Sequence, residues 1–188
     1  MNTSVMFRLV VVLMTAAAVR AEDQSALKEM PPPVKQHEWL QQFVGDWDVT
    51  VEVTMEPGKP SVRGKGSEST RMLGGFWVIA EGKGELEGTP GTISSLLTLG
   101  YDANANQFVG TWIDSMNSYL WKYKGKLDAT RKVLTLETEG PCPHRTGLVR
   151  FREVIEFKSK DHRVFTSSML GEDGRWVTMV TAHYRRSK

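Results

Sequence analysis

The amino-acid sequence predicts an all-β fold, a single antiparallel up-and-down β-barrel of about ten strands with a short helix before the first strand. Segments in which polar and apolar residues alternate recur about every 10–12 residues along most of the 188-residue chain. The turns between them are too short for crossover helices, so neighbouring strands should run antiparallel. Several segments also exceed the average strand of about 5–6 residues. Long strands with one apolar face close most economically into a barrel, which removes exposed edges. A β-sandwich is the structural alternative.

The N-terminal segment is predicted to be a secretory signal peptide. Met1–Arg8 is short and carries a positive charge, Leu9–Ala18 is almost wholly apolar, and small residues follow as far as Ala21. An apolar core of about 7–15 residues is typical of a signal peptide, whereas a membrane span needs about 20. We expect cleavage after Ala21, with Ala18 as second choice and an uncleaved anchor as the alternative, and a secreted or periplasmic protein. The expected organisation is therefore signal peptide 1–21, linker 22–33 and barrel domain 34–188.

The charge balance argues against two classes of partner. The chain has 24 Lys and Arg against 22 Asp and Glu, and loss of Arg8 and Arg20 with the signal peptide brings the two counts level. A neutral chain without a block of basic residues lacks the electrostatic footprint of a nucleic-acid binder. It also lacks the polybasic segment that would hold it on an anionic membrane. We therefore expect neither nucleic acid nor, after signal cleavage, a membrane as partner.

The single cysteine, Cys142, excludes an internal disulfide in a secreted chain. Cys142 lies between two prolines in a loop-like stretch, close to His144. These two residues lack a second Cys/His pair at zinc-like spacing, so the sequence predicts no metal site. We expect no cofactor either.

The first elements of the domain are predicted to be a helix and a strand. In Val34–Val44 the apolar residues recur at spacings of one, three and four, which indicates a one-sided helix that ends at Gly45. From Trp47 to Met55 apolar and polar residues alternate strictly, as in a half-buried strand. Further strands are expected over residues 62–73, 76–86, 94–101, 108–115, 119–127, 133–139, 148–157, 164–170 and 175–185.

Short motifs along the chain resemble known barrel families. Gly45-Asp46-Trp47 after a helix resembles the Gly-x-Trp signature of lipocalin and calycin barrels. This resemblance implies that Trp47 closes the barrel bottom under an arginine of the last strand, Arg185 or Arg186. In a haem-binding branch of these barrels, the nitrobindin-like proteins, a histidine late in the chain is used, and His183 is late in this chain.

A longer series of motifs resembles one bacterial family, the domain-of-unknown-function family 1579, which is grouped with calycin-like barrels. The resemblance covers Trp39 to Arg186 and implies the barrel fold without assigning an activity. The general calycin theme implies capture of small, largely apolar molecules inside the barrel. The motifs that carry the resemblance are Leu73-Gly-Gly-Phe-Trp, Gly100-Tyr-Asp, Thr111-Trp-Ile-Asp-Ser, Arg152-Glu-Val and Tyr184-Arg-Arg.

Side-chain alternation identifies aromatic residues that should face the barrel interior. Lys122 and Lys124 must face water, so Tyr119, Trp121 and Tyr123 should face inward. Such aromatics are core packing if the interior is filled. A barrel of about ten strands is, however, wider than the roughly eight whose side chains just fill it. Spare volume lined by aromatic residues is typical of a small-molecule site.

Two acidic residues are also candidates for the interior. Glu153 shares a face with Ile155 in an otherwise apolar row. Asp114 shares a face with Trp112 unless a β-bulge near Gly110 switches it, and the opposite face of that strand is apolar as well, so its orientation stays open.

An inward carboxylate is costly unless it is paired or hydrogen-bonded. Asp114 or Glu153 could orient a polar ligand group or act as an acid/base with a raised pKa. The structural alternatives are an ion pair, for example with Arg63 or Arg71, or a place at the wet barrel mouth.

Three hypotheses follow for the function. The first is a barrel that binds a small, partly apolar ligand, with Trp112, Tyr119 and Trp121 lining the cavity and Asp114 and Glu153 as polar anchors. The second is an enzyme that uses Asp114 or Glu153 as general acid/base in the same cavity, although the sequence contains no familiar nucleophile or phosphate-loop motif. The third is a filled structural or interaction barrel. The sequence does not decide whether the protein is an enzyme.

Overall fold

The structure, a computed structural model, describes residues 32–142 and 145–188. The predicted signal peptide, its cleavage site, nearly all of the predicted linker, and His144 lie outside the described residues. The compact domain begins at Val34 and runs to Lys188. Among the described residues no helix is long and apolar enough to cross a membrane.

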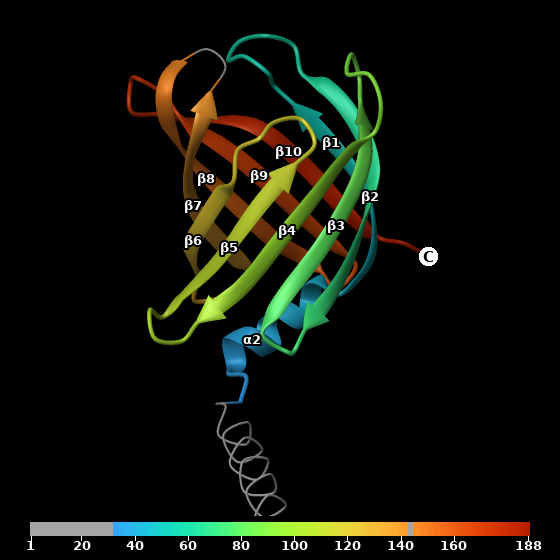
Figure 1. The fold of residues 1–188 in the computed structure, drawn as a ribbon, viewed down its shortest axis with the longest axis vertical. Coiled ribbons are helices and arrows are strands. Elements are labelled where there is room, and N and C mark those ends of the chain that lie inside the picture. Colours follow the sequence, from blue (N-terminus) through green and yellow to red (C-terminus); the bar gives the residue numbers. More distant parts are fainter. Residues whose placement is uncertain (1–31, 143–144) are drawn as a thin grey trace, which may run out of the picture. The chain divides into compact units, whose positions relative to one another are not determined.

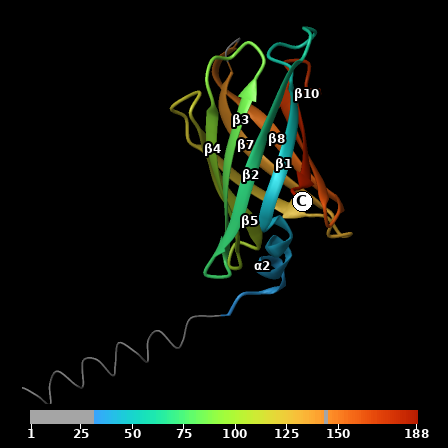
Figure 2. The same ribbon diagram turned by 90° about the vertical axis from the view of Figure 1, so that its right-hand side faces the viewer.

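The domain is a closed β-barrel in which every strand pairs with its sequence neighbours and β1 pairs with β10, antiparallel throughout (Figures 1 and 2). The described residues thus confirm the predicted barrel and rule out the sandwich. The strands are β1 Gly45–Val53, β2 Val62–Leu73, β3 Trp77–Leu86, β4 Ile93–Asp102, β5 Gln107–Asp114, β6 Trp121–Leu127, β7 Val133–Cys142, β8 Arg145–Ser159, β9 His162–Leu170 and β10 Trp176–Arg186.

The predicted helix is present as the short α-helix α2, Lys35–Leu40, continued by the 3-10 turn η2, Gln41–Phe43. It lies under the end of the barrel at which β1 begins (Figures 1 and 2). His37 is buried and its Nε2 lies 2.9 Å from the carbonyl oxygen of Tyr101, which ties the helix to the end of β4. This end of the barrel is therefore closed by the helix.

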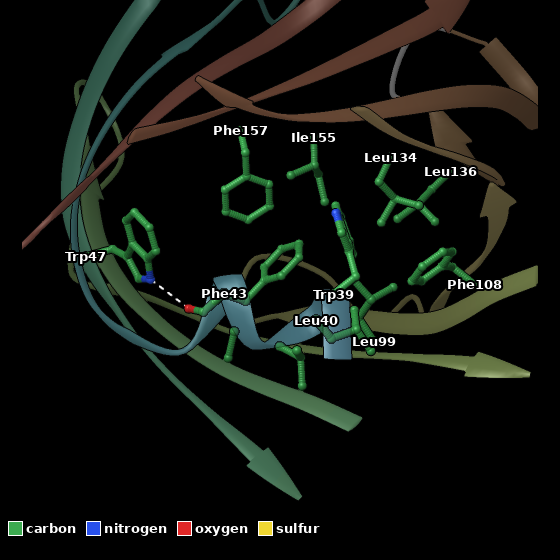
Figure 3. Packing of buried hydrophobic residues seen from close by; sticks show 12 residues of the cluster. Trp39, Leu40, Phe43, Trp47, Leu99, Phe108, Leu134, Leu136, Ile155 and Phe157 are labelled. Atoms are coloured by element: carbon green, nitrogen blue, oxygen red, sulfur yellow. Dashed lines mark hydrogen bonds between the residues drawn. The ribbon is translucent and has the colours of Figure 1, made fainter. Parts of the chain in front are cut away.

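Large apolar side chains fill the closed end (Figure 3). Trp39 and Phe43 project from the helix into the barrel and make edge-to-face contacts with Phe157. Such aromatic pairs contribute about 0.5–1.5 kcal/mol beyond the area they bury. The buried cluster consists of Trp39, Leu40, Phe43, Trp47, Val78, Ala80, Leu99, Phe108, Leu134, Leu136, Ile155 and Phe157.

Trp47 has the position that the Gly-x-Trp resemblance implied. Its indole Nε1 donates a hydrogen bond of 2.8 Å to the carbonyl oxygen of Phe43. The guanidinium of Arg186 lies 4.3 Å from the ring centroid, and its Nη1 donates to the carbonyl oxygen of Val44 at 2.8 Å. Of the two arginines considered, Arg186 is therefore the one that covers Trp47, while Arg185 is exposed.

The strand predicted over 119–127 starts two residues later in the structure. β6 begins at Trp121, and Tyr119 lies in the loop before it. Asp114 Oδ1 accepts the backbone N–H groups of Met116 and Asn117, and Asn117 Oδ1 accepts that of Tyr119. These side-chain bonds take backbone donors that a strand would use, because short polar side chains compete with the sheet ladder.

Candidate functional site

The two halves of the barrel interior differ in how well side chains fill them. At the closed end, inward residues such as Leu99 and Phe108 are fully buried. Toward the open end many inward residues keep part of their surface accessible to solvent, whereas others, such as Leu86, Val149 and Met169, are buried. Side chains therefore fill this half less completely than the closed end. The partly accessible residues include Val51, Val53, Gly64, Gly66, Gly82, Gly84, Ser95, Leu97, Trp112, Trp121, Tyr123 and Phe151.

Glycines leave one wall of the open half without side chains. Gly66 of β2 and Gly84 of β3 are directly paired, and both lie on the inward face. A Cβ added at Gly66 would lie 2.3 Å from the carbonyl oxygen of Lys83, so glycine is required where these strands bend closely past each other. Glycine kinks of this kind curve a sheet into a barrel. The same residues thereby leave room inside.

Glu153 is the most unusual polar group facing this space. Its side chain lies between Leu136 and Ser167 of the neighbouring strands, and the residue is only 4% exposed. Oε1 accepts a hydrogen bond from Ser167 Oγ at 3.1 Å, whereas Oε2 has no hydrogen-bond partner among the described residues. Burial raises the pKa of Glu153 to about 8, and the bond from Ser167 lowers it in part. At neutral pH this carboxyl therefore holds a proton.

The ion pairs considered for Glu153 are not formed. Arg63 points outward and pairs with Glu52 at 3.2 Å, and Arg71 is exposed on the outer face of β2. The salt bridges among the described residues include none to Glu153 or to Asp114.

Two further polar side chains lie on the inward faces of β6 and β7. Thr138, paired with Phe151 and 6% exposed, has a hydroxyl with no hydrogen-bond partner among the described residues. Tyr123 has a pKa raised well above 10, chiefly by burial and then by the nearby charges of Glu153, Tyr184 and Asp114. The three side chains give this part of the interior a small polar patch surrounded by apolar residues.

A buried ion pair lies among the aromatic residues of the closed end. Arg163 pairs with Glu68, both being almost fully buried, and Thr70 Oγ1 donates to Glu68 Oε1 at 2.8 Å. The Arg163 guanidinium also lies 4.7 Å from the ring centroid of Trp47. The sequence analysis missed this pair. Side-chain alternation could have indicated it, because Arg163 lies an even number of positions from Phe165 and Met169 and therefore shares their inward face.

Asp114 and Trp112 both face the interior. The register pairs Trp112 with Leu97 and Asp114 with Ser95, on the face that carries buried Phe108. Trp112 Nε1 donates to Asp114 Oδ2 at 3.2 Å, and Oδ1 accepts the backbone bonds of the turn that follows β5. The Asp114 carboxylate thus holds Trp112 and the turn. Of the two acids, Glu153 is the one with an oxygen, Oε2, that has no hydrogen-bond partner in the described part of the chain.

Tyr119 and Trp121 lie at an incomplete seam of the wall. β6 and β7 pair over only four positions, Lys124–Leu127 with Leu134–Glu137, although both strands continue beyond Lys124 and Glu137. There the Tyr119 hydroxyl donates to the carbonyl oxygen of Glu139 at 2.9 Å, and Trp121 covers Gly140.

A groove of about 880 Å³ follows this seam. It is lined both by inward residues, Tyr123 and Thr138, and by outward ones such as Lys122 and Glu137. The groove therefore borders two of the three residues of the polar patch, Tyr123 and Thr138, at the wall between β6 and β7.

His183 lies on the outer face of the barrel, in register with Thr50 and Val164. Its Nδ1 is 3.2 Å from Nε2 of His162, and the two rings stack. The haem-binding role considered for His183 inside the barrel is therefore not compatible with its orientation.

The comparisons with known proteins agree with this fold. The family model described as "Protein of unknown function (DUF1579)" matches residues 32–186. A search of curated proteins finds no match. The chain is similar to the structure of S-type phycobiliprotein lyase CPES from Guillardia theta, with a TM-score of 0.55 and 14% identity over 83% of this chain and 99% of that one. It is also similar to Rv2717c from M. tuberculosis, with a TM-score of 0.59 and 11% identity over 84% of this chain and 100% of that one.

Proposed function

This chain belongs to the DUF1579 family, and we propose that it binds a small, partly apolar molecule in the open half of its barrel. Trp112 and Trp121 form the walls of the site, Tyr119 closes the seam beside it, and Glu153 is its polar anchor. Asp114 acts through Trp112, whose indole it orients. The chain shares its barrel fold with a protein described as a phycobiliprotein lyase, and barrels wider than about eight strands can enclose a ligand cavity.

The observation that carries this proposal is the unsatisfied polar chemistry of the interior. Glu153 Oε2 and Thr138 Oγ1 are buried without a hydrogen-bond partner among the described residues. Each such group costs about 1–3 kcal/mol. A ligand that reaches both would recover this free energy, and its apolar part would cover the partly accessible Trp112 and Leu97. Convergent polar groups in an apolar pocket are typical of small-molecule sites.

A matched pair of leucines in β4 tests where a ligand binds. Leu97 faces inward opposite Trp112, whereas its neighbour Leu96 faces outward opposite Ile113. Nile red, a neutral apolar dye, should gain fluorescence on binding the wild-type protein. Leu97→Trp should abolish this gain by filling the interior, and Leu96→Trp should leave it unchanged. Equal binding by both variants would place the dye outside the barrel, and no binding by the wild type would favour the filled barrel.

An enzyme is the second candidate, because the pKa of about 8 places the Glu153 proton in the range where general acid/base catalysis is effective. Binding is the stronger reading, because catalytic acids and bases usually stand beside other groups that activate the reacting atoms, and among the described residues Glu153 has Ser167 as its one hydrogen-bond partner. Native mass spectrometry of a copurified ligand, before and after a day of incubation, separates the two. An unchanged ligand mass supports binding, and a ligand mass that changes with wild type but not with Glu153→Gln supports catalysis.

We propose as well that the protein is exported, because residues 1–21 have the composition of a signal peptide. The intact mass of the protein from its own cells should lack these residues. Retention of Met1–Ala21 in the mature protein would contradict export by this route.

A further inference from the structure

Inside the barrel, acidic side chains outnumber the basic side chains that could pair with them among the described residues. Arg163 is paired with Glu68, and Arg186, at the closed end, is paired with Asp161 at 3.3 Å. Two inward acids remain, Asp114 and Glu153. The rim residue Arg145 pairs with Glu172 of the loop after β9, at 3.6 Å. Among the described residues the open half thus contains acidic groups without a cationic partner.

Aromatic rings surround these acids. Trp121 lies 5.2 Å from both Tyr119 and Phe151, measured between ring centroids. Trp112 is paired with Trp121 across β5 and β6, and Tyr123 follows on the same inward face. The face of an aromatic ring carries negative potential and attracts cations, tryptophan most strongly. The acids and the ring faces therefore both favour a positively charged ligand.

We propose that the ligand of this barrel is an organic cation, a protonated amine on an apolar or aromatic body. The proposal rests on the binding function proposed above and names the class of ligand. The ammonium group donates hydrogen bonds to Glu153 Oε2 and Thr138 Oγ1, the two acceptors that have no partner among the described residues. The apolar body lies against Trp112 and Trp121.

The proton balance of binding follows from the protonation of Glu153. Without ligand the carboxyl is protonated at neutral pH. When the ammonium group enters, Glu153 gives its proton to the solvent and the carboxylate pairs with the cation, so one proton leaves for each amine bound. A neutral hydrogen-bond acceptor, such as a carbonyl group, would instead bind the protonated form and release none.

The other groups that face Glu153 do not obscure this titration. Ser167 and Thr138 on the neighbouring strands do not ionise in this range. The pKa values of Tyr123 and Tyr184 are raised from 10, chiefly by burial, so both remain neutral. Among the described residues the other charges toward the interior are the Glu68–Arg163 pair, Arg186 at the closed end, and Asp114, whose carboxylate is held by the Trp112 indole and the turn.

Isothermal titration calorimetry with three matched probes tests the proposal. The probes are 2-phenylethylamine, 2-phenylethanol and phenylacetate, which carry a cation, a neutral hydroxyl and an anion. We expect the amine to bind at least about tenfold more tightly than the alcohol, and phenylacetate to bind more weakly still. Titrations at pH 7 in phosphate and Tris, whose ionisation enthalpies differ, should show release of nearly one proton per amine. Between pH 6 and 7.5 the affinity should rise by about tenfold per unit and level off above pH 8.

Two glutamates on opposite faces of β8 provide the variants. Glu153→Gln keeps the shape of the protonated side chain and should lose both the preference for the amine and the proton release. Glu156→Gln alters a glutamate on the outer face, which pairs with Lys158, and should bind like the wild type. Equal affinity for amine and alcohol, or an amine preference that survives Glu153→Gln, would overturn the proposal.

Nile red separates this inference from the function on which it rests. If Nile red binds inside the barrel and 2-phenylethylamine does not displace it, the inference is wrong while the binding function stands. If neither Nile red nor the amine binds, both are wrong. Displacement by the amine and not by the alcohol supports both.

Discussion

Replacing Glu153 by glutamine should stabilise the protein by an amount that depends strongly on pH. The pKa of Glu153 is raised from 4.5 to about 8 in the folded protein. The folded state therefore holds a proton that the unfolded chain releases above about pH 4.5. The stability connected with this group is fully present below pH 4.5 and is lost as the pH rises through 8.

The size of the effect follows from the shift. One pKa unit corresponds to about 1.36 kcal/mol. A shift from 4.5 to about 8 therefore lowers the stability of the wild type by about 1 kcal/mol at pH 5, about 3 kcal/mol at pH 7 and about 5 kcal/mol above pH 9. Glutamine does not ionise and escapes this loss. The advantage of Glu153→Gln should grow with pH in the same way.

Urea unfolding followed by tryptophan fluorescence at pH 5, 7 and 9 measures this difference. Subtracting the wild type from the variant removes the contribution of the other ionisable groups. Glu156→Gln, on the outer face of the same strand, should give a difference that hardly changes with pH. A difference for Glu153→Gln that stays flat from pH 5 to 9 would refute the reasoning, because Glu153 would then titrate alike in the folded and unfolded states.

Three further predictions concern the packing of the barrel. Arg163→Met leaves Glu68 buried without its partner and should lower the free energy of unfolding in urea by about 3–5 kcal/mol. If the double variant with Glu68→Gln regains this stability, the cost comes from the unpaired charge. A single variant as stable as the wild type would contradict the prediction. Trp39→Ala should cost about 3–5 kcal/mol by the same assay, because the ring fills the closed end; a loss below 1 kcal/mol would mean that the helix does not contribute to the core. Tyr119→Phe removes the hydroxyl that donates to the carbonyl oxygen of Glu139. It should speed amide hydrogen exchange in the adjoining parts of β6 and β7 and leave β1 unaffected. Exchange in β6 and β7 at the wild-type rate would show that this bond does not hold the seam.

Much of the fold could be predicted from alternation, because each strand of a barrel has one face toward water. Lys122 and Lys124 assigned the inward face of β6 in this way, and the structure places Trp121 and Tyr123 there. Asp114 could not be assigned from the sequence, since both faces of β5 carry apolar residues. Its orientation was decided only by the register with β4.

The pairing of charges could not be predicted, because it depends on which strands meet across the interior. Glu68 and Arg163 are 95 positions apart and come together only when the sheet closes. Arg63 and Arg71, suggested as partners of Asp114 or Glu153, were wrong. Each lies an odd number of positions from the inward Glu68 on β2 and therefore faces out of the barrel. Similarly, nothing in the alternation of β6 and β7 indicates that their ladder stops at Lys124 and Glu137.

The short ladder between β6 and β7 separates folding stability from access to the interior. Opening this seam breaks the Tyr119 bond and at most four positions of pairing, while the cluster around Trp39 and Phe43 stays intact at the closed end. Entry of the proposed ligand along this seam would therefore leave the core at the closed end folded. Under the proposed binding function, substitutions along the groove would change the rate of ligand entry without disturbing the core that keeps the barrel folded.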